Sequence, residues 1–203
     1  MHKDFYHTIS SPSEGIYTEK RSKFLAFAFP VFSTEDVKQI VETHQKKYYD
    51  ARHVCYAYII GAEKLIFRAN DNGEPSGTAG KPILGQINSN ELTNILILVV
   101  RYFGGIKLGT SGLAMAYRRA AAEAIANATI IERTIDENIH ITFNYFQIND
   151  VMKIIKDSKV QMIDQTFEMN CTMTLRIRKS LLLELCLKLK KIESLRFDED
   201  RNL

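Results

Sequence analysis

The sequence predicts an α+β protein with two domains in tandem. Short apolar runs typical of strands alternate with amphipathic helical stretches along the whole chain of 203 residues. All 10 glycines and all 4 prolines lie at or before Gly112, so the composition changes before Arg133. We therefore expect an N-terminal domain over residues 1–133 and a C-terminal domain over residues 134–203.

Composition narrows the class of protein further. The chain is 45% hydrophobic and 25% charged, which is enough apolar material for two small cores. The 3 cysteines are far apart and form no Cys-x-x-Cys pair, so neither a disulfide framework nor a zinc ribbon is indicated. The first residues lack the apolar core of a signal peptide, and Pro30 breaks the longest apolar run. We expect a cytoplasmic protein without a membrane span.

The first domain begins with strand-like segments and an amphipathic helix. Apolar residues alternate or cluster over 15–19 and 24–29, and Pro30 closes the second of these two strands. The segment 33–36, Ser-Thr-Glu-Asp, fits a helix start. Apolar residues then recur at helical spacing and predict one buried stripe: Val37, Ile40, Val41, His44 and Tyr48.

The middle of the chain predicts a hairpin that leads into a glycine-rich loop. Residues 54–60 and 65–69 form the two strands of this hairpin, and residues 81–88 form a short helix after the loop. The apolar run 95–100 predicts a buried strand with Arg101 at its exit. An alanine-rich helix follows over residues 111–128.

The second domain has its own regular order of elements. We expect strands at 137–143, 160–167 and 170–178, helices at 146–157 and 180–191, and a last strand near the end. This β-α-β-β-α-β order is that of ferredoxin-like domains.

The first glycine-rich segment, 71–80, packs three glycines and two hydroxyl residues into ten positions. Successive N–H groups in such turns can form an anion-binding nest. The residues that define this loop are Gly73, Glu74, Pro75, Gly77, Thr78 and Gly80. Its carboxylates, Asp71 and Glu74, are candidates for a general acid/base or Mg²⁺ pair, although acids in loops often serve as turn formers and caps.

The second glycine-rich segment, 101–112, joins the buried strand to the alanine-rich helix. Its N–H groups and the helix dipole favour a phosphate beside Arg101 and Lys107. It is not a mononucleotide P-loop, because Thr110 stands where that motif needs lysine. The alternative is that these glycines only permit tight turns and close helix–sheet contact.

Nucleophiles and metal ligands give weaker signals. His53 and Cys55 are two apart on a predicted strand and face the same side, as a Cys/His nucleophile pair would. Packing is the commoner reason for such a pair, because no third orienting group is visible. The 5 histidines show no metal-ligand spacing. We expect no metal site and no cofactor.

Four segments, 19–24, 51–58, 73–84 and 101–109, resemble the IMPACT family of bacterial YigZ/YvyE-type proteins and their eukaryotic relatives. Residues 15–130 look like the core domain of that family. Asn72 replaces an acid of the family pattern, and Met115 replaces an arginine. The resemblance implies a first domain of the ribosomal-protein type shared with the fourth domain of elongation factor G. It also implies a ferredoxin-like second domain similar to that factor's fifth, and contact with the ribosome or RNA.

From these observations we expect a non-enzymatic, translation-associated regulatory factor that binds RNA or ribosome phosphates, with a protein partner as a further expectation. The net charge is +3, and the whole excess lies before residue 134. The expected binding surface comprises Arg21, Lys23, Lys81, Arg101, Tyr102, Gly104, Gly105, Lys107, Gly109, Thr110 and Ser111. Two alternatives stay open: an enzyme that acts on a phosphorylated small molecule or nucleotide through Asp71 and Glu74, and a protein-interaction module without a ligand.

Overall fold

The computed structural model describes residues 4–158 and 160–198. They divide into two compact units, each with its own core. The first unit is Phe5–Arg133, and the described part of the second comprises Asp4 and residues 134–198 apart from 159. The mixed α+β class with several sheets is as expected from the sequence.

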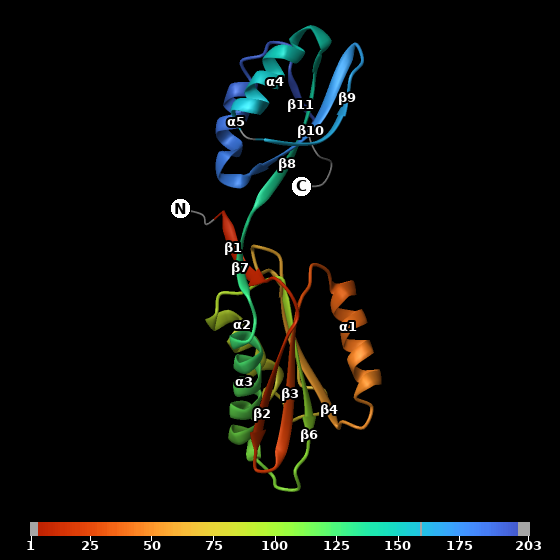
Figure 1. The fold of residues 1–203 in the computed structure, drawn as a ribbon, viewed down its shortest axis with the longest axis vertical. Coiled ribbons are helices and arrows are strands. Elements are labelled where there is room, and N and C mark those ends of the chain that lie inside the picture. Colours follow the sequence, from red (N-terminus) through yellow and green to blue (C-terminus); the bar gives the residue numbers. More distant parts are fainter. Residues whose placement is uncertain (1–3, 159, 199–203) are drawn as a thin grey trace. The chain divides into compact units, whose positions relative to one another are not determined.

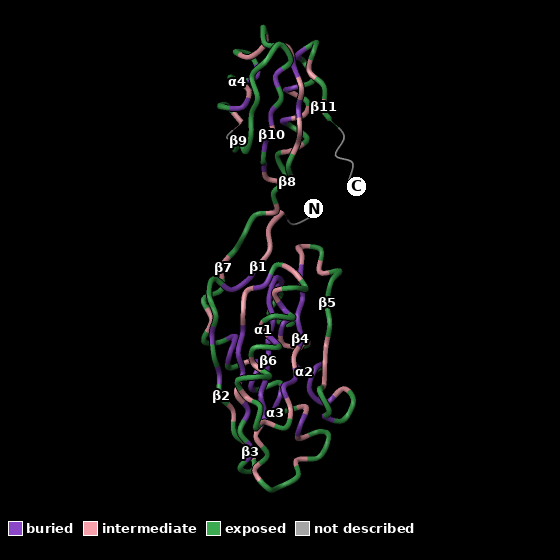
Figure 2. The backbone as a smooth tube through the Cα atoms, turned by 90° about the vertical axis from the view of Figure 1, so that its right-hand side faces the viewer, coloured by how far each residue is buried: buried purple, intermediate pink, exposed green. Residues whose placement is uncertain are grey.

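A five-stranded antiparallel sheet forms the centre of the first unit. Its strands, in spatial order, are β2 (Ser13–Glu19), β3 (Ser22–Pro30), β6 (Ile95–Tyr102), β4 (His53–Ile60) and β5 (Ile66–Asn70). Residues 95–101 of β6 are all buried, because helices cover both faces of the sheet there. In Figure 2 the buried stretches accordingly run along the middle of the sheet.

The helices of the first unit lie in two layers. Figure 1 shows α1 (Thr34–Lys47) on one face of the sheet, with α2 (Gly80–Ser89) and α3 (Gly109–Ala126) on the other. Successive side chains of a strand point to opposite faces, so Val99 packs under α2 and α3 whereas Val100 packs under α1. The same alternation sends Arg101 and Tyr102 to opposite faces.

The ends of the helices refine the sequence prediction. Ser33 and Asp36 form a capping box at the start of α1, as the sequence pattern indicates. Helix α3 begins at Gly109, two residues before the predicted start. Gly109 and Thr110 therefore lie in the first turn of α3 rather than in the loop before it.

Two strands were not predicted. β1 (Phe5–Ile9) and β7 (Ile130–Thr134) pair as a separate two-stranded sheet. β7 is exposed or half-buried throughout and therefore carries no strong apolar signal. Its pairing with a segment more than a hundred residues earlier in the sequence is a tertiary contact that local periodicity does not reveal.

The second unit consists of an antiparallel four-stranded sheet and two helices. Its elements are β8 (Asp136–Asn144), η1 (Tyr145–Gln147), α4 (Ile148–Asp157), β9 (Gln161–Thr166), β10 (Asn170–Arg178), η2 (Lys179–Leu181), α5 (Leu182–Leu189) and β11 (Arg196–Asp198). The strand order is β11-β8-β10-β9, and both helices contribute to one core with alternate residues of β8 and β10. Arg178 also pairs with Asp4, and this hydrogen bond lowers the pKa of the Asp4 carboxyl to about 2.

Within residues 4–158 and 160–198, none of the helices has the length and apolar character that a membrane crossing requires.

Candidate functional site

The two glycine-rich segments of the first unit meet at one cavity of about 470 Å³. Gly73 to Pro75 come from the loop after β5, and Lys107 to Thr110 come from the start of α3. The full lining is Arg52, His53, Gly73, Glu74, Pro75, Arg101, Phe103, Lys107, Leu108, Gly109, Thr110 and Leu113.

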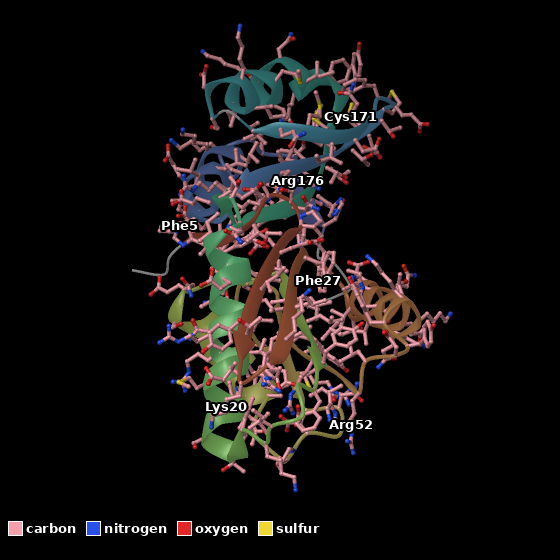
Figure 3. All side chains as sticks on the ribbon, turned by 60° about the horizontal axis from the view of Figure 1, so that its bottom comes forward. Phe5, Lys20, Phe27, Arg52, Cys171 and Arg176 are labelled. Atoms are coloured by element: carbon pink, nitrogen blue, oxygen red, sulfur yellow. The ribbon has the colours of Figure 1, made fainter. Side chains whose placement is uncertain are left out.

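The cavity lies at one end of the five-stranded sheet. His53 starts β4 and is in register with Arg101 near the end of β6, so these two residues come from adjacent strands. Figure 3 labels Arg52 and Lys20 at this end of the first unit. Strand pairing therefore brings residues that are far apart in the sequence to the same end of the sheet.

A buried ion pair between two residues of the cavity lining joins the two glycine-rich segments. Arg101 donates through Nη1 to Oε1 of Glu74 at 2.7 Å, and their side chains are only 8% and 3% exposed. The hydroxyl of Tyr117 in α3 donates to the same carboxylate oxygen at 2.8 Å. Burial raises the pKa of Tyr117, and the nearby Cys55 and Glu74 raise it further, so the phenol stays protonated and acts as a donor.

Cys55 belongs to this network as a packed thiol. Its Sγ lies 2.9 Å from the carbonyl oxygen of Asp71 and 3.4 Å from the hydroxyl of Tyr117, and the residue is fully buried. Burial raises the pKa of the Cys55 thiol to about 12. The thiolate is the nucleophilic form of cysteine, so this environment opposes the nucleophile that the His53–Cys55 spacing allowed.

Asp71 organises the backbone of the first glycine-rich loop. Its carboxylate accepts hydrogen bonds from the N–H groups of Gly77, Ala79 and Gly80, at 2.8 to 2.9 Å. Burial alone would raise the pKa of Asp71, but these donors and the charge of Lys81 hold it below its ordinary value. The carboxylate of Asp71 thus accepts hydrogen bonds from N–H groups that could otherwise form a nest for a bound anion.

The guanidinium of Arg101 has an unusual environment. Its centre lies 5.6 Å from the ring centroids of both Phe24 and Phe103. Phe24 is buried in the core, whereas Phe103 is about half exposed and lines the cavity. The Nε–H group of Arg101 is buried without a hydrogen-bond partner, which is uncommon for a charged donor in a protein interior.

The start of α3 supplies further donors at the cavity. Leu108 is the N-cap of α3, and no side chain caps this helix end. The first N–H groups of the helix, at Gly109 and Thr110, are therefore not satisfied in the way that a Ser or Asp cap would satisfy them. The side chains of Lys107 and Thr110 are exposed beside them.

The structure brings part of the predicted surface together. Of the predicted site residues, the cavity collects Gly73, Glu74, Pro75, Arg101, Lys107, Gly109 and Thr110. It is not lined by Arg21, Lys23, Gly77, Thr78, Gly80, Lys81, Tyr102, Gly104, Gly105 or Ser111. The side chain of Tyr102 lies on the α1 face, where its hydroxyl donates to Asp50 at 3.0 Å.

Sequence reasoning did not assign Arg52 or Tyr117 to the site. Arg52 precedes β4 and reaches the cavity through the pairing of β4 with β6. Tyr117 follows Gly109 by eight residues, or just over two turns of α3, and lies within the alanine-rich helix that the sequence predicts. The signal for Tyr117 is a polar atom within an otherwise apolar helix face, because a buried phenol needs a hydrogen-bond partner.

The two loop carboxylates considered for metal or proton-transfer chemistry have separate roles here. Asp71 accepts three backbone N–H groups, and Glu74 accepts Arg101 and Tyr117. In the part of the chain that the structure describes, no three His, Cys, Asp or Glu side chains form a group that could hold a metal ion.

A family model and two bacterial relatives match this part of the chain and carry the same family name. A model described as the Impact N-terminal domain matches residues 20–125. The chain is 32% identical over 154 residues to IMPACT family member YvyE of Bacillus subtilis (strain 168), which covers 76% of this chain and 71% of that protein. It is 33% identical over 153 residues to IMPACT family member YigZ of Escherichia coli (strain K12), with 73% and 74% covered.

A solved structure is similar over nearly the whole chain. It is described as the crystal structure of a hypothetical protein, and it has a TM-score of 0.75 and 26% sequence identity. The likeness covers 99% of this chain and 100% of that one.

Proposed function

Because this chain belongs to the IMPACT family, we propose that it is a cytoplasmic translation-regulatory factor whose first unit binds RNA phosphates, free or within the ribosome, at the cavity between its two glycine-rich segments. The observation that carries this proposal is that Arg52, Lys107 and the uncapped start of α3 border one cavity. The resemblance of its motifs to the IMPACT family, which implies contact with the ribosome or RNA, supports the link to translation.

The charges at the cavity favour an anion. Glu74 is the carboxylate that lines the cavity, and its charge is already matched by Arg101. Arg52 and Lys107 therefore give the cavity a net positive charge, and the dipole of α3 adds to it. Phosphate contacts of this kind supply affinity and position without reading base sequence.

The finer fold types belong to the same proposal. The β-α-β-β-α-β order and the strand order β11-β8-β10-β9 support a ferredoxin-like type for the second unit. For the first unit we propose the ribosomal-protein type shared with the fourth domain of elongation factor G, in line with the resemblance of its motifs. As a further part of the proposal, a protein partner would bind in addition to RNA and not in place of it.

The test is binding of a single-stranded oligoribonucleotide at several salt concentrations. Affinity should fall with salt at a slope of roughly 0.7 in log–log form per phosphate contact. Lys107→Ala and Arg52→Ala should each weaken binding and lower that slope by about one contact. Lys38→Ala, at an exposed position in α1 on the other face of the sheet, is the matched control and should leave binding unchanged. Absent binding, or binding that does not respond to salt, would contradict the proposal.

A further inference from the structure

We infer that the cavity takes a phosphomonoester, carried at the end of a single RNA strand or by a free mononucleotide, in preference to the internal phosphodiesters of a strand. This inference rests on the proposed function for the RNA-borne form and makes a sharper statement about the same site. It follows from the depth of the cavity, the number of donors around it and its size.

Depth favours a chain end. The inner wall of the cavity is formed by Glu74 and Arg101, which are both more than nine-tenths buried, whereas Lys107 and Thr110 are exposed at its border. An internal phosphodiester continues into a nucleotide on each side, so it can only pass across the opening. A terminal phosphate continues on one side and can enter the cavity.

The donors exceed what a diester needs. Gly109 and Thr110 at the start of α3 line the cavity together with Arg52 and Lys107, so this lining includes backbone N–H groups, a hydroxyl residue and two cationic residues. The charge of Arg101 is matched by Glu74 and adds no net charge to this set, although its buried Nε–H has no hydrogen-bond partner. A phosphomonoester offers three terminal oxygens and a charge of about −1.5 to −2 at neutral pH. A diester offers two such oxygens and one charge, so the monoester uses this donor set more fully.

Size and lining allow a sugar and base to follow the phosphate. A volume of about 470 Å³ lies within the range of small-ligand sites, on the order of 300–1,000 Å³. Phe103 presents a half-exposed ring at the cavity, and bases of any sequence can stack on such a ring. The cavity therefore fits one terminal nucleotide whose phosphate enters past the exposed Lys107 and Thr110 and stays beside the first turn of α3.

The experiment compares one short oligoribonucleotide with a 5′-phosphate, with a 3′-phosphate and with hydroxyl groups at both ends, next to a nucleoside 5′-monophosphate as competitor. At least one phosphorylated form should bind about 10-fold or more tightly than the hydroxyl form, a difference that corresponds to about 1.4 kcal/mol. The monophosphate should compete for the same site. In Lys107→Ala and Thr110→Ala the ratio of the affinity for the phosphorylated form to that for the hydroxyl form should fall towards one. In Lys38→Ala this ratio should stay as in the wild type.

Each outcome separates this inference from the proposed function. Equal, salt-dependent affinity for all three oligonucleotides would overturn the phosphomonoester inference and leave RNA binding in place. Binding of the monophosphate alone would support the phosphomonoester site and contradict the RNA part of the proposed function. No binding of any probe would overturn both. A preference that persists unchanged in Lys107→Ala and Thr110→Ala would place the phosphate elsewhere and also overturn the inference.

Discussion

Arg101 and Glu74 form a salt bridge of 2.7 Å between the two glycine-rich segments, and both side chains are almost completely buried. The bridge fixes the first loop against the end of β6 and so sets the shape of the cavity. A buried charge that loses its partner is costly, whereas an exposed pair contributes little. This contrast allows a direct test of how the site is held together.

Replacing Glu74 by alanine should destabilise the first unit by about 3–5 kcal/mol, because Arg101 is then left buried without a counter-charge. Urea unfolding followed by circular dichroism measures the change, with the two units treated as separate transitions where they resolve. The control is Glu184→Ala, which removes the Lys188 pair on the surface of α5 and should have little effect. Equal effects of the two substitutions would show that the buried pair contributes no more than an exposed one.

Tyr117→Phe should destabilise the first unit by about 1–2 kcal/mol, because Glu74 loses one of its two side-chain donors while the ring keeps its packing against Phe24. In the Glu74→Ala background the same substitution should cost measurably less, since the hydroxyl has already lost that acceptor. Additive losses in the double variant would show that the hydroxyl acts independently of Glu74.

The sequence predicted the local parts of this arrangement well. The capping box at Ser33 and Asp36, the apolar stripe of α1 and the buried run of β6 are encoded by neighbouring residues, so periodicity and capping rules find them. The start of α3 was displaced by two residues, because Gly109 and Thr110 read as loop in a segment rich in glycine. Boundaries of this kind depend on backbone geometry that composition does not specify.

The site depended on tertiary contacts that the sequence pattern does not contain. Arg101 was predicted at a strand exit, but the sequence pattern did not show that Glu74 would neutralise its charge. The two-residue period of β6 separates Arg101 from Tyr102, so two adjacent candidates for one surface lie on opposite faces. Arg52 reached the cavity through the register of β4 with β6, which is a non-local pairing.

Asp71→Asn should lower stability at neutral pH by about 1.5–3 kcal/mol, because charge-assisted bonds to three backbone N–H groups are weakened. The folded-state pKa of Asp71 lies below its ordinary value of 3.8, so its contribution is present above that value and is lost as pH falls through the folded pKa. The difference in stability between wild type and variant should therefore be constant from pH 5 to 7 and shrink below about pH 4. Urea unfolding at each pH measures it, and a difference that stays constant to pH 2 would contradict this role for Asp71.

Cys55 should resist alkylation in the native protein, because its thiol is buried and its pKa is raised to about 12. Iodoacetamide at pH 8 followed by peptide mass analysis should find Cys55 unmodified until urea unfolds the first unit. Cys55→Ala should also keep RNA affinity within about twofold, corresponding to less than about 0.5 kcal/mol. Rapid native labelling at Cys55 would restore the nucleophile hypothesis, whereas loss of binding in a folded Cys55→Ala protein would show that packing of this thiol supports the cavity.

Gly104→Ala should destabilise the first unit by about 3 kcal/mol and weaken RNA binding. A Cβ at Gly104 would lie 2.0 Å from the carbonyl carbon of Arg21 and 2.3 Å from the nitrogen of Ser22, so backbone atoms in the β2–β3 turn have to move. Gly104 also donates its N–H to the hydroxyl of Ser22 at 3.2 Å, and displacement of this contact would shift Phe103 and Lys107 at the cavity.

Gly85→Ala is the matched control, because a Cβ there meets no atom within 4 Å and the position lies inside α2. It should leave binding unchanged and raise stability by about 0.5–1 kcal/mol, since alanine favours a helix interior. Urea unfolding and the oligoribonucleotide assay on both variants separate the two effects. The contrary outcome is that Gly104→Ala lowers stability and yet leaves RNA affinity unchanged at a temperature where the variant is folded. In that case the close approach of Gly104 to Arg21 supports the fold and does not position Phe103 and Lys107 at the cavity.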